Sequence, residues 1–337
     1  MATYKEIQGT AVQSLASSTG TEEGQIWYDT SSDNFKLTSV TSSGSWSTGG
    51  AIPKQISSGG GGGSQTAAWI TGGLQYPGGT KDLSFNYDGS TWTASATLPA
   101  NKSNIAAAGP QTSGVIWGNS KPGPSNVTFE YDSSAWTAGG TFPTNEKEYP
   151  IGMGASQTAA LSAGGRGDPP PSGQTAVYNY NGTAWTTNPN SLPAGQYNAV
   201  GDGPNTASWF AGGAGPTPNT SMLLFDGEGW TTGGTTNVPH TNTAPGQGFG
   251  SQTDALVCGG DAPTQNASEV YDGTSWSVDA TMTTARFYGG SGAKSQGNTS
   301  TGFVTAGSTP STSPTHSGAT EEYVSAGAPS VVTLTTS

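Results

Sequence analysis

The chain has 337 residues, of which 9% are charged, and it carries a formal net charge of −12 at pH 7. Its 10 lysines and arginines cannot form the basic stripe that neutralises phosphates, so we expect no nucleic acid among its partners. No apolar run is long enough to span a membrane, and the first residues, MATYKEIQGT, contain no secretory signal, so we expect synthesis in a cytoplasm and no membrane insertion.

Residues 1–42 form a segment of their own, because the phrases that recur later in the chain do not occur in them. Within this segment, IWYD and FKLTSV are strand-like runs separated by Thr, Ser, Asp and Asn. This pattern predicts a β-hairpin. We therefore expect a short N-terminal β-hairpin extension before the main fold begins at residue 43.

A nine-residue phrase then recurs, with copies such as QTAAWITGG (65–73), QTAALSAGG (157–165) and QTDALVCGG (252–260). Each copy is an apolar run that ends in one or two glycines. The first of these glycines in each of the six copies lies 46 to 48 residues from the one in the next copy. A fixed period of this length indicates a repeat architecture. The first glycines are Gly72, Gly118, Gly164, Gly212, Gly259 and Gly307.

An aromatic residue follows each copy, and in five of the six a tryptophan comes five residues after it. Asp-Gly or Asn-Gly usually lies between the two, which is a strong signal for a β-hairpin. We expect these rings to fill the space between neighbouring repeats. The aromatics are Tyr87, Tyr131, Tyr180, Phe225, Tyr271 and Tyr323, and the tryptophans are Trp92, Trp136, Trp185, Trp230 and Trp276.

The sequence of each repeat thus predicts four strands. They are a glycine-rich strand a, the apolar strand b, strand c ending at the aromatic, and strand d beginning at the tryptophan. Strand a belongs innermost, where the repeats converge and side chains have the least room. The pattern resembles the kelch motif over about residues 46–324, which implies a six-bladed β-propeller. The arginine often found after strand d in kelch repeats is represented only by Arg286.

The two ends of the repeat region complement each other. The sixth repeat reaches Tyr323 without a following tryptophan, whereas Trp46 begins a strand d with no strands a to c before it. We therefore predict that the strand at Trp46 completes the sixth blade. The propeller then spans residues 43–327 and leaves residues 328–337 as a C-terminal tail.

Catalytic sites known on similar folds have poor counterparts here. Sialidases bind a carboxylate with an arginine cluster, but this chain has only Arg166 and Arg286. Copper-radical sugar oxidases need two histidines, two tyrosines and a cysteine. The chain has His240, His316 and Cys258, but Cys258 lies in an apolar strand where a small buried residue is expected. We expect no catalytic residue, no metal and no cofactor, and hence no enzyme.

The long, proline-rich loops all join strand b to strand c, so one face of the predicted propeller carries them. The turns between strands c and d, on the opposite face, are short. Charged and histidine side chains in the long loops are the candidate ligand contacts. They are Lys121, Arg166, Asp168, Asp261 and His316.

The segment around IWYDTSSDNFKLTSV resembles part of tail-fibre and other virion proteins of marine bacteriophages, and the repeats resemble kelch-like proteins of such phages. The resemblance implies a non-enzymatic virion structural protein made in the host cytoplasm. Within that class we expect a tail-associated, adhesin-like propeller that presents its loops to a host-surface glycan or protein. Residues 1–42 would bind other virion proteins.

Three alternatives remain open at this point. The chain could be a capsid decoration protein or a cytoplasmic interaction scaffold. It could also be a polysaccharide-binding or -processing propeller, in which acids such as Glu146, Asp168 and Asp261 would have to converge.

Overall fold

The computed structural model describes residues 13–17, 25–40, 43–75, 77–118, 125–144, 148–167, 173–215, 220–244, 246–261, 266–289, 291–292, 299–310, 316–327 and 329–333. The chain forms two compact units: a main unit, residues 45–324, and a terminal unit, residues 1–44 together with 325–337. The regular elements in these ranges are all strands, which confirms the all-β class. They include no helix long and apolar enough to cross a membrane.

The described part of the main unit contains six four-stranded antiparallel sheets, numbered here 1 to 6 and given from inner to outer strand. Sheet 1 is β6 (Gly60–Ser64), β7 (Ala67–Thr71), β10 (Ser84–Tyr87) and β11 (Trp92–Ala94). Sheet 2 is β12 (Ala106–Ala108), β13 (Gly114–Trp117), β14 (Phe129–Tyr131) and β15 (Trp136–Ala138). Sheet 3 is β16 (Ile151–Ser156), β17 (Ala159–Ala163), β18 (Val177–Tyr180) and β19 (Trp185–Asn188).

Sheets 4 to 6 follow the same order, except that the last strand of sheet 6 comes from the start of the chain. Sheet 4 is β20 (Val200–Asp202), β21 (Ser208–Ala211), β22 (Met222–Phe225) and β23 (Trp230–Thr232). Sheet 5 is β24 (Gly248–Ser251), β25 (Asp254–Cys258), β26 (Ser268–Tyr271) and β27 (Trp276–Val278). Sheet 6 is β28 (Ser291–Gly292), β29 (Thr301–Thr305), β30 (Thr320–Val324) and β4 (Ser45–Thr48). A three-stranded sheet joins β5 (Ile56–Ser57), β8 (Leu74–Gln75) and β9 (Gly79–Thr80).

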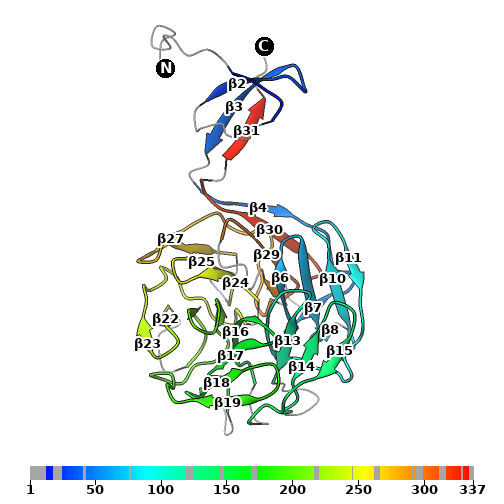
Figure 1. The fold of residues 1–337 in the computed structure, drawn as a ribbon, viewed down its shortest axis with the longest axis vertical. Coiled ribbons are helices and arrows are strands. Elements are labelled where there is room, and N and C mark those ends of the chain that lie inside the picture. The colour runs from blue at the N-terminus through cyan, green and yellow to red at the C-terminus, as the bar shows by residue number, and fades with distance from the viewer. Residues whose placement is uncertain are drawn as a thin grey trace. The chain divides into compact units, whose positions relative to one another are not determined.

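The inner strands are the glycine- and alanine-rich strands a, and they lie side by side around a common centre (Figure 1). Strand β6 lies next to β12, β12 next to β16, β16 next to β20, β20 next to β24, and β28 next to β6. The fit is tight, because a Cβ added at Gly152 would lie only 2.7 Å from the Ala107 carbonyl oxygen. Glycine therefore allows the inner strands to approach one another.

The repeated tryptophans link each sheet to the preceding one. The Trp136 indole donates to Ser84 Oγ of sheet 1 at 3.0 Å, and the Trp92 indole donates to Thr320 Oγ1 of sheet 6 at 2.8 Å. The links therefore run through all six sheets and return from sheet 1 to sheet 6. The indoles of Trp185, Trp230, Trp276 and Trp46 reach Thr128, Asn190, Gly234 and Ala280 in the same direction.

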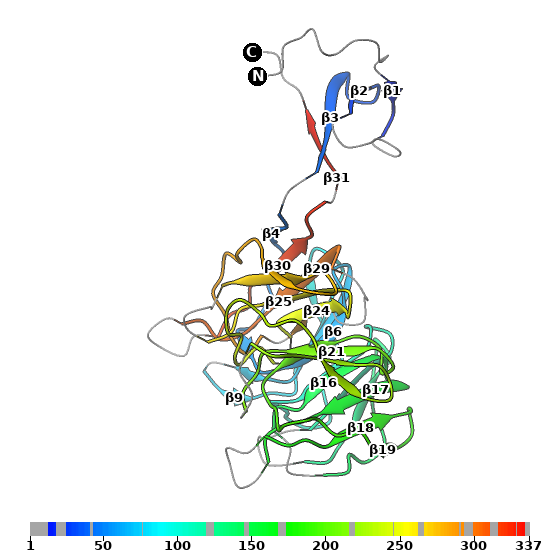
Figure 2. The ribbon, with the colours of Figure 1, turned by 90° about the vertical axis from the view of Figure 1, so that its left-hand side faces the viewer.

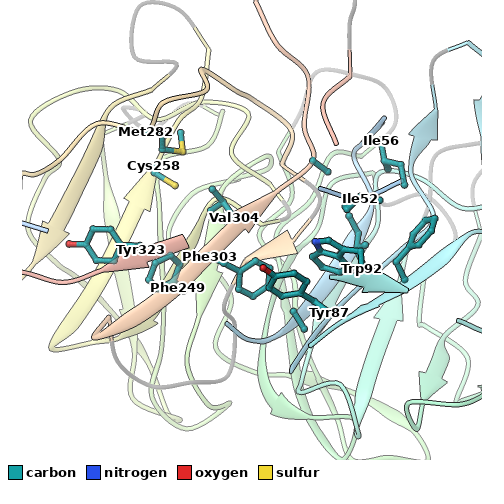
Figure 3. Close-up of a cluster of buried hydrophobic side chains, with 14 of the residues drawn as sticks. Ile52, Ile56, Tyr87, Trp92, Phe249, Cys258, Met282, Phe303, Val304 and Tyr323 are labelled. Atoms are coloured by element: carbon teal, nitrogen blue, oxygen red, sulfur yellow. The ribbon is translucent and has the colours of Figure 1, made fainter. Parts of the chain in front are cut away.

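The repeated aromatics of strand c occupy the same spaces. Tyr87 stacks on Trp92 of its own sheet at 4.8 Å between ring centroids, and its hydroxyl donates to Glu322 of sheet 6. Both rings also approach Phe303 of sheet 6, within one buried cluster that Figure 3 shows. Such aromatic packing supplies the apolar area that a chain poor in leucine and isoleucine otherwise lacks.

Strand β4 is the fourth strand of sheet 6. It pairs antiparallel with β30, and Trp46 lies opposite Tyr323, as the incomplete repeats at the two ends predict. The other five sheets pair an aromatic with a tryptophan at this place, across a turn of four residues. In sheet 6 the turn is replaced by the two chain segments that lead to the terminal unit.

The terminal unit contains a four-stranded sheet in the order β1 (Gln13–Leu15), β2 (Ile26–Asp29), β3 (Asn34–Val40) and β31 (Pro329–Thr333) (Figure 2). Strands β2 and β3 are the hairpin expected from the sequence. The C-terminal residues 329–333, expected as a separate tail, instead pair with β3. The boundaries also differ from the expected 42/43 and 327/328, because the chain divides at 44/45 and 324/325.

The turns between strands c and d are held by an acidic or amide side chain. Asp88 Oδ1 accepts the backbone N–H groups of Ser90 and Thr91 at 2.8 and 2.7 Å. These hydrogen bonds hold the pKa of the Asp88 carboxyl well below its usual range. Asn181 makes the same two contacts in sheet 3 without a titratable group. Asp132, Asp226 and Asp272 repeat the arrangement of Asp88.

We expect replacement of these four aspartates by asparagine to make the fold less sensitive to acid. Each aspartate has a lower pKa folded than unfolded, so its stabilisation is complete above the unfolded value, about 3.9, and is lost as pH falls through the folded one. The variant should match the wild type at pH 7 and have the higher melting temperature at pH 2–3. Equal acid sensitivity in both proteins would contradict the expectation.

Candidate functional site

One end of the main unit brings together the starts of the b–c loops and the segments that lead from strand d into the next strand a. Arg166 and Glu148 exchange two backbone hydrogen bonds, at 2.7 and 3.2 Å, and Ser308 and Phe287 do the same at 2.7 and 3.0 Å. The glycine pairs direct the chain there, since Gly73 donates its N–H to the Lys102 carbonyl. The glycine that ends each of the six copies of the nine-residue phrase, or begins the glycine pair there, has positive φ. We call this end the ring face.

Six residues at equivalent positions form a hydrogen-bonded ring at this face, one before each strand a. They are Ser58, Asn104, Tyr149, Asn198, Asn242 and Tyr288, called here the ring residues. Five backbone N–H to carbonyl bonds of 2.7–3.5 Å join neighbouring members. The remaining link, between Asn198 and Asn242, is made by the side chains, with Asn198 Nδ2 donating to Asn242 Oδ1 at 2.7 Å. The ring is therefore continuous.

All six ring residues have left-handed backbone, with φ between 51° and 58°. Asparagine adopts this conformation readily, which explains its use at three of the six positions. Tyrosine does not, because the Cβ crowds the following carbonyl and tyrosine lacks the short polar side chain whose local hydrogen bonds offset this in asparagine. The backbone alone therefore gives no reason for Tyr149 and Tyr288, and strained residues of this kind often mark functional sites.

Tyr149 and Tyr288 occupy opposite positions of the ring, and their side chains meet across its centre. The two rings stack with centroids 5.7 Å apart and an interplanar angle of 23°. Their hydroxyls hydrogen-bond to each other, and that of Tyr149 also hydrogen-bonds to Asn104. Both side chains are half-buried. Burial is the main cause that raises the pKa of each phenol, so both stay protonated at neutral pH.

Polar side chains surround the tyrosine pair. Asn242 Nδ2 donates to Asp261 Oδ2, and Arg166 lies 3.5 Å from the Glu148 carboxylate. Asp261 is close enough to raise the pKa of Tyr288 further, and Arg166 is close enough to oppose that effect. The centre of the ring face thus combines an aromatic pair with amides, one cation and two carboxylates.

The structure brings two of the five predicted ligand contacts to this centre. Arg166 and Asp261 lie beside the ring, at equivalent starts of two b–c loops. His316 lies one step further out, with its Nδ1 3.2 Å from Ser308 Oγ, and burial lowers its pKa. Lys121 and Asp168 fall outside the described residues.

The residues considered for other chemistry are structural in the described part of the chain. His240 is fully buried, between the Gly259 carbonyl at 2.8 Å and Glu269 at 3.3 Å. Cys258 is also fully buried, which raises the pKa of its thiol. Arg286 pairs with Glu321 inside the protein. Within the described ranges, no three His, Cys, Asp or Glu side chains gather in a way that would hold a metal ion.

Sequence reasoning did not identify the ring residues. A signal exists for three of them, since Asn104, Asn198 and Asn242 each precede a strand a. The glutamine that opens four copies of the nine-residue phrase has a structural role as well. In the structure, the amides of Gln111 and Gln252 donate to two carbonyls each of the preceding sheet, at 2.7–3.4 Å.

Comparison with known proteins agrees with this architecture. No family model and no curated protein sequence match the chain. Among 260 matching chains of solved structures is the one titled "Structure of YjhT", with a TM-score of 0.62 and 13% sequence identity. The match covers 81% of this chain and 96% of that one. The likeness supports a β-propeller-like fold and concerns the fold alone.

Proposed function

We propose that the chain is a six-bladed kelch-type propeller that serves as a non-enzymatic, tail-associated attachment protein of a bacteriophage virion. Each sheet would be one blade, with β4 completing the sixth. The tryptophan links that pass through all six sheets and return from sheet 1 to sheet 6 support this reading. The virion assignment rests on the sequence resemblance of the segment around IWYDTSSDNFKLTSV and of the repeats.

The observation that carries the attachment role is where the chain leaves the main unit. Ser45 and Val324 are paired neighbours at the end of sheet 6 where the other sheets have their c–d turns. The ring face is formed at the opposite ends of the strands, by the b–c loops and the segments before each strand a. The chain therefore passes between the two units at the end of sheet 6 opposite the ring face. An attachment protein needs this separation of an anchor from a binding surface.

Incorporation of variants into particles tests the proposal. Trp27 lies in the terminal sheet and is 2% exposed. The substitution Trp27→Ala removes the largest buried side chain among the described residues of the terminal unit and should destabilise that unit. We expect the full-length variant to be lost from purified particles while its main unit melts at the wild-type temperature. The matched control Tyr149→Asn, on the ring face, should be incorporated normally.

Mass spectrometry of purified particles gives the readout. Absence of the wild-type protein from particles, despite its presence in infected cells, would contradict the virion role. A particle map in which neighbouring chains bury the whole ring face would instead favour a capsid decoration protein.

A further inference from the structure

Three residues in the segments that flank Tyr149 each carry a buried polar atom with no hydrogen-bond partner in the described part of the chain. The atoms are Arg166 Nε, Gln196 Oε1 and Asn198 Oδ1. Asn198 and Gln196 are 5% and 1% exposed. In native proteins such atoms are usually satisfied by the protein, by water or by a ligand. Their grouping at one sector of the ring therefore calls for an explanation.

Asn198 is itself a ring residue, and Gln196 and Arg166 lie in the segments beside it. Asn198 donates its N–H to the Tyr149 carbonyl at 3.5 Å, and Gly165, next to Arg166, donates to the Gln196 carbonyl at 2.7 Å. One donor and two acceptors thus belong to residues in the backbone segments that flank Tyr149, whose side chain is half-buried. A ligand that suits them must offer both donors and acceptors, as a hydroxyl group does.

The charge at this place argues against an anionic ligand. The Arg166 guanidinium already lies beside the Glu148 carboxylate, and Asp261 adds a negative charge near Tyr288. The protein as a whole carries −12. An anion would meet a field that repels it, whereas a neutral polyhydroxyl compound would not.

From these observations we propose that the centre of the ring face binds a neutral saccharide. The tyrosine pair, Tyr149 and Tyr288, offers apolar ring surface to the C–H groups of a sugar. The polar atoms of Arg166, Gln196 and Asn198 exchange hydrogen bonds with its hydroxyls. The inference rests on the proposed attachment function and identifies the ligand of that face.

The test uses two substitutions that the ring itself suggests. Tyr149→Asn and Tyr288→Asn insert the residue that occupies three other ring positions with the same left-handed backbone, so we expect the fold to be kept. The matched control is Phe35→Asn, which removes an exposed aromatic from the terminal unit. Circular dichroism and the melting temperature should show that all three variants are folded.

Binding is measured with the full chain on immobilised neutral hexose and N-acetylhexosamine oligosaccharides, with uronic-acid and sulfated oligosaccharides alongside, and then by calorimetry on the best binder. We expect the wild type and Phe35→Asn to bind a neutral oligosaccharide. Each tyrosine variant should bind roughly tenfold more weakly or worse, a loss of about 1.4 kcal/mol or more.

The outcomes separate this inference from the proposed function. Wild-type binding only to acidic sugars, or neutral-sugar binding that survives both tyrosine substitutions, would overturn the saccharide site. If the wild type attached to host cells but bound no sugar, the saccharide site would also be overturned, whereas the proposed attachment function would be retained. Failure to attach to cells and absence from particles would remove the proposed function itself.

Discussion

Deletion of residues 1–48 is expected to leave the protein insoluble. The deletion removes β4, so the edge of β30 loses its partner and the Tyr323 ring loses Trp46, whose centroid lies 5.0 Å away. The Trp46 indole also ceases to donate to the Ala280 carbonyl of the segment that leaves sheet 5. An unpaired strand edge beside newly exposed apolar surface favours aggregation. The measurement is the soluble fraction after expression, followed by the melting temperature of any soluble product.

A permuted chain provides the control that separates β4 from the rest of the deleted segment. In sheet 5 the residues Asp272 to Ser275 join Tyr271 to Trp276, and the same four-residue turn can join Tyr323 to Trp46. With new ends opened in the turn between Tyr87 and Trp92, this chain lacks the terminal unit but keeps β4. We expect it to be soluble and to melt close to the main unit of the full chain. An unfolded permutant, or a deletion variant that melts normally, would show that β4 does not complete the fold.

The strand order of the main unit could be predicted because one local pattern recurs in register. The glycines fix the end of strand b, and the aromatic and tryptophan fix the two sides of the c–d turn. Trp46 and Tyr323 lie at opposite ends of the repeat region, and their pairing followed from counting which strand each terminal repeat lacked. A repeat thus allows a contact between distant residues to be predicted as directly as a local one.

The ring could not be predicted in the same way. Its members share a backbone conformation and not a residue type. Ser58, Asn104 and Tyr288, for example, occupy equivalent positions in three different repeats. Strand β31 was missed for another reason. Its pairing with β3 joins residues almost 300 positions apart, such as Lys36 and Thr333, and no second copy of either segment marks them as partners.

The buried pair of Arg286 and Glu321 is expected to produce the largest effect of any single substitution outside the aromatics. Arg286 Nη2 donates to Glu321 Oε1 at 2.6 Å, and its Nη1 donates to the carbonyls of Ala306 and Ala319. Glu321 also accepts the N–H groups of Thr283 and Thr284 at 2.7 and 2.9 Å. The side chains are 0% and 2% exposed, so neither charge has water to replace its partner.

Arg286→Met should therefore lower the free energy of unfolding by about 3–5 kcal/mol, because it leaves the Glu321 carboxylate buried without its cation. The double variant Arg286→Met, Glu321→Leu should recover much of that loss. Leucine is tolerated at the equivalent place in sheet 4, where Leu223 stands in strand c. Equal destabilisation in the single and double variants would show that packing around Arg286 matters and that its charge does not.

The pH dependence of the same pair gives an independent check. Burial raises the pKa of Glu321, but the hydrogen bonds from Thr283 and the charge of Arg286 outweigh it, and the net pKa is lowered. A carboxyl with a lowered folded pKa stabilises the fold fully above its unfolded value, about 4.3, and loses that contribution as pH falls through the folded one. The stability gap between the wild type and Glu321→Gln should thus be widest near pH 7 and should narrow in acid. Urea unfolding at pH 7, 5 and 3 measures it, and a gap that stays constant would mean that Glu321 acts through its shape and hydrogen bonds alone.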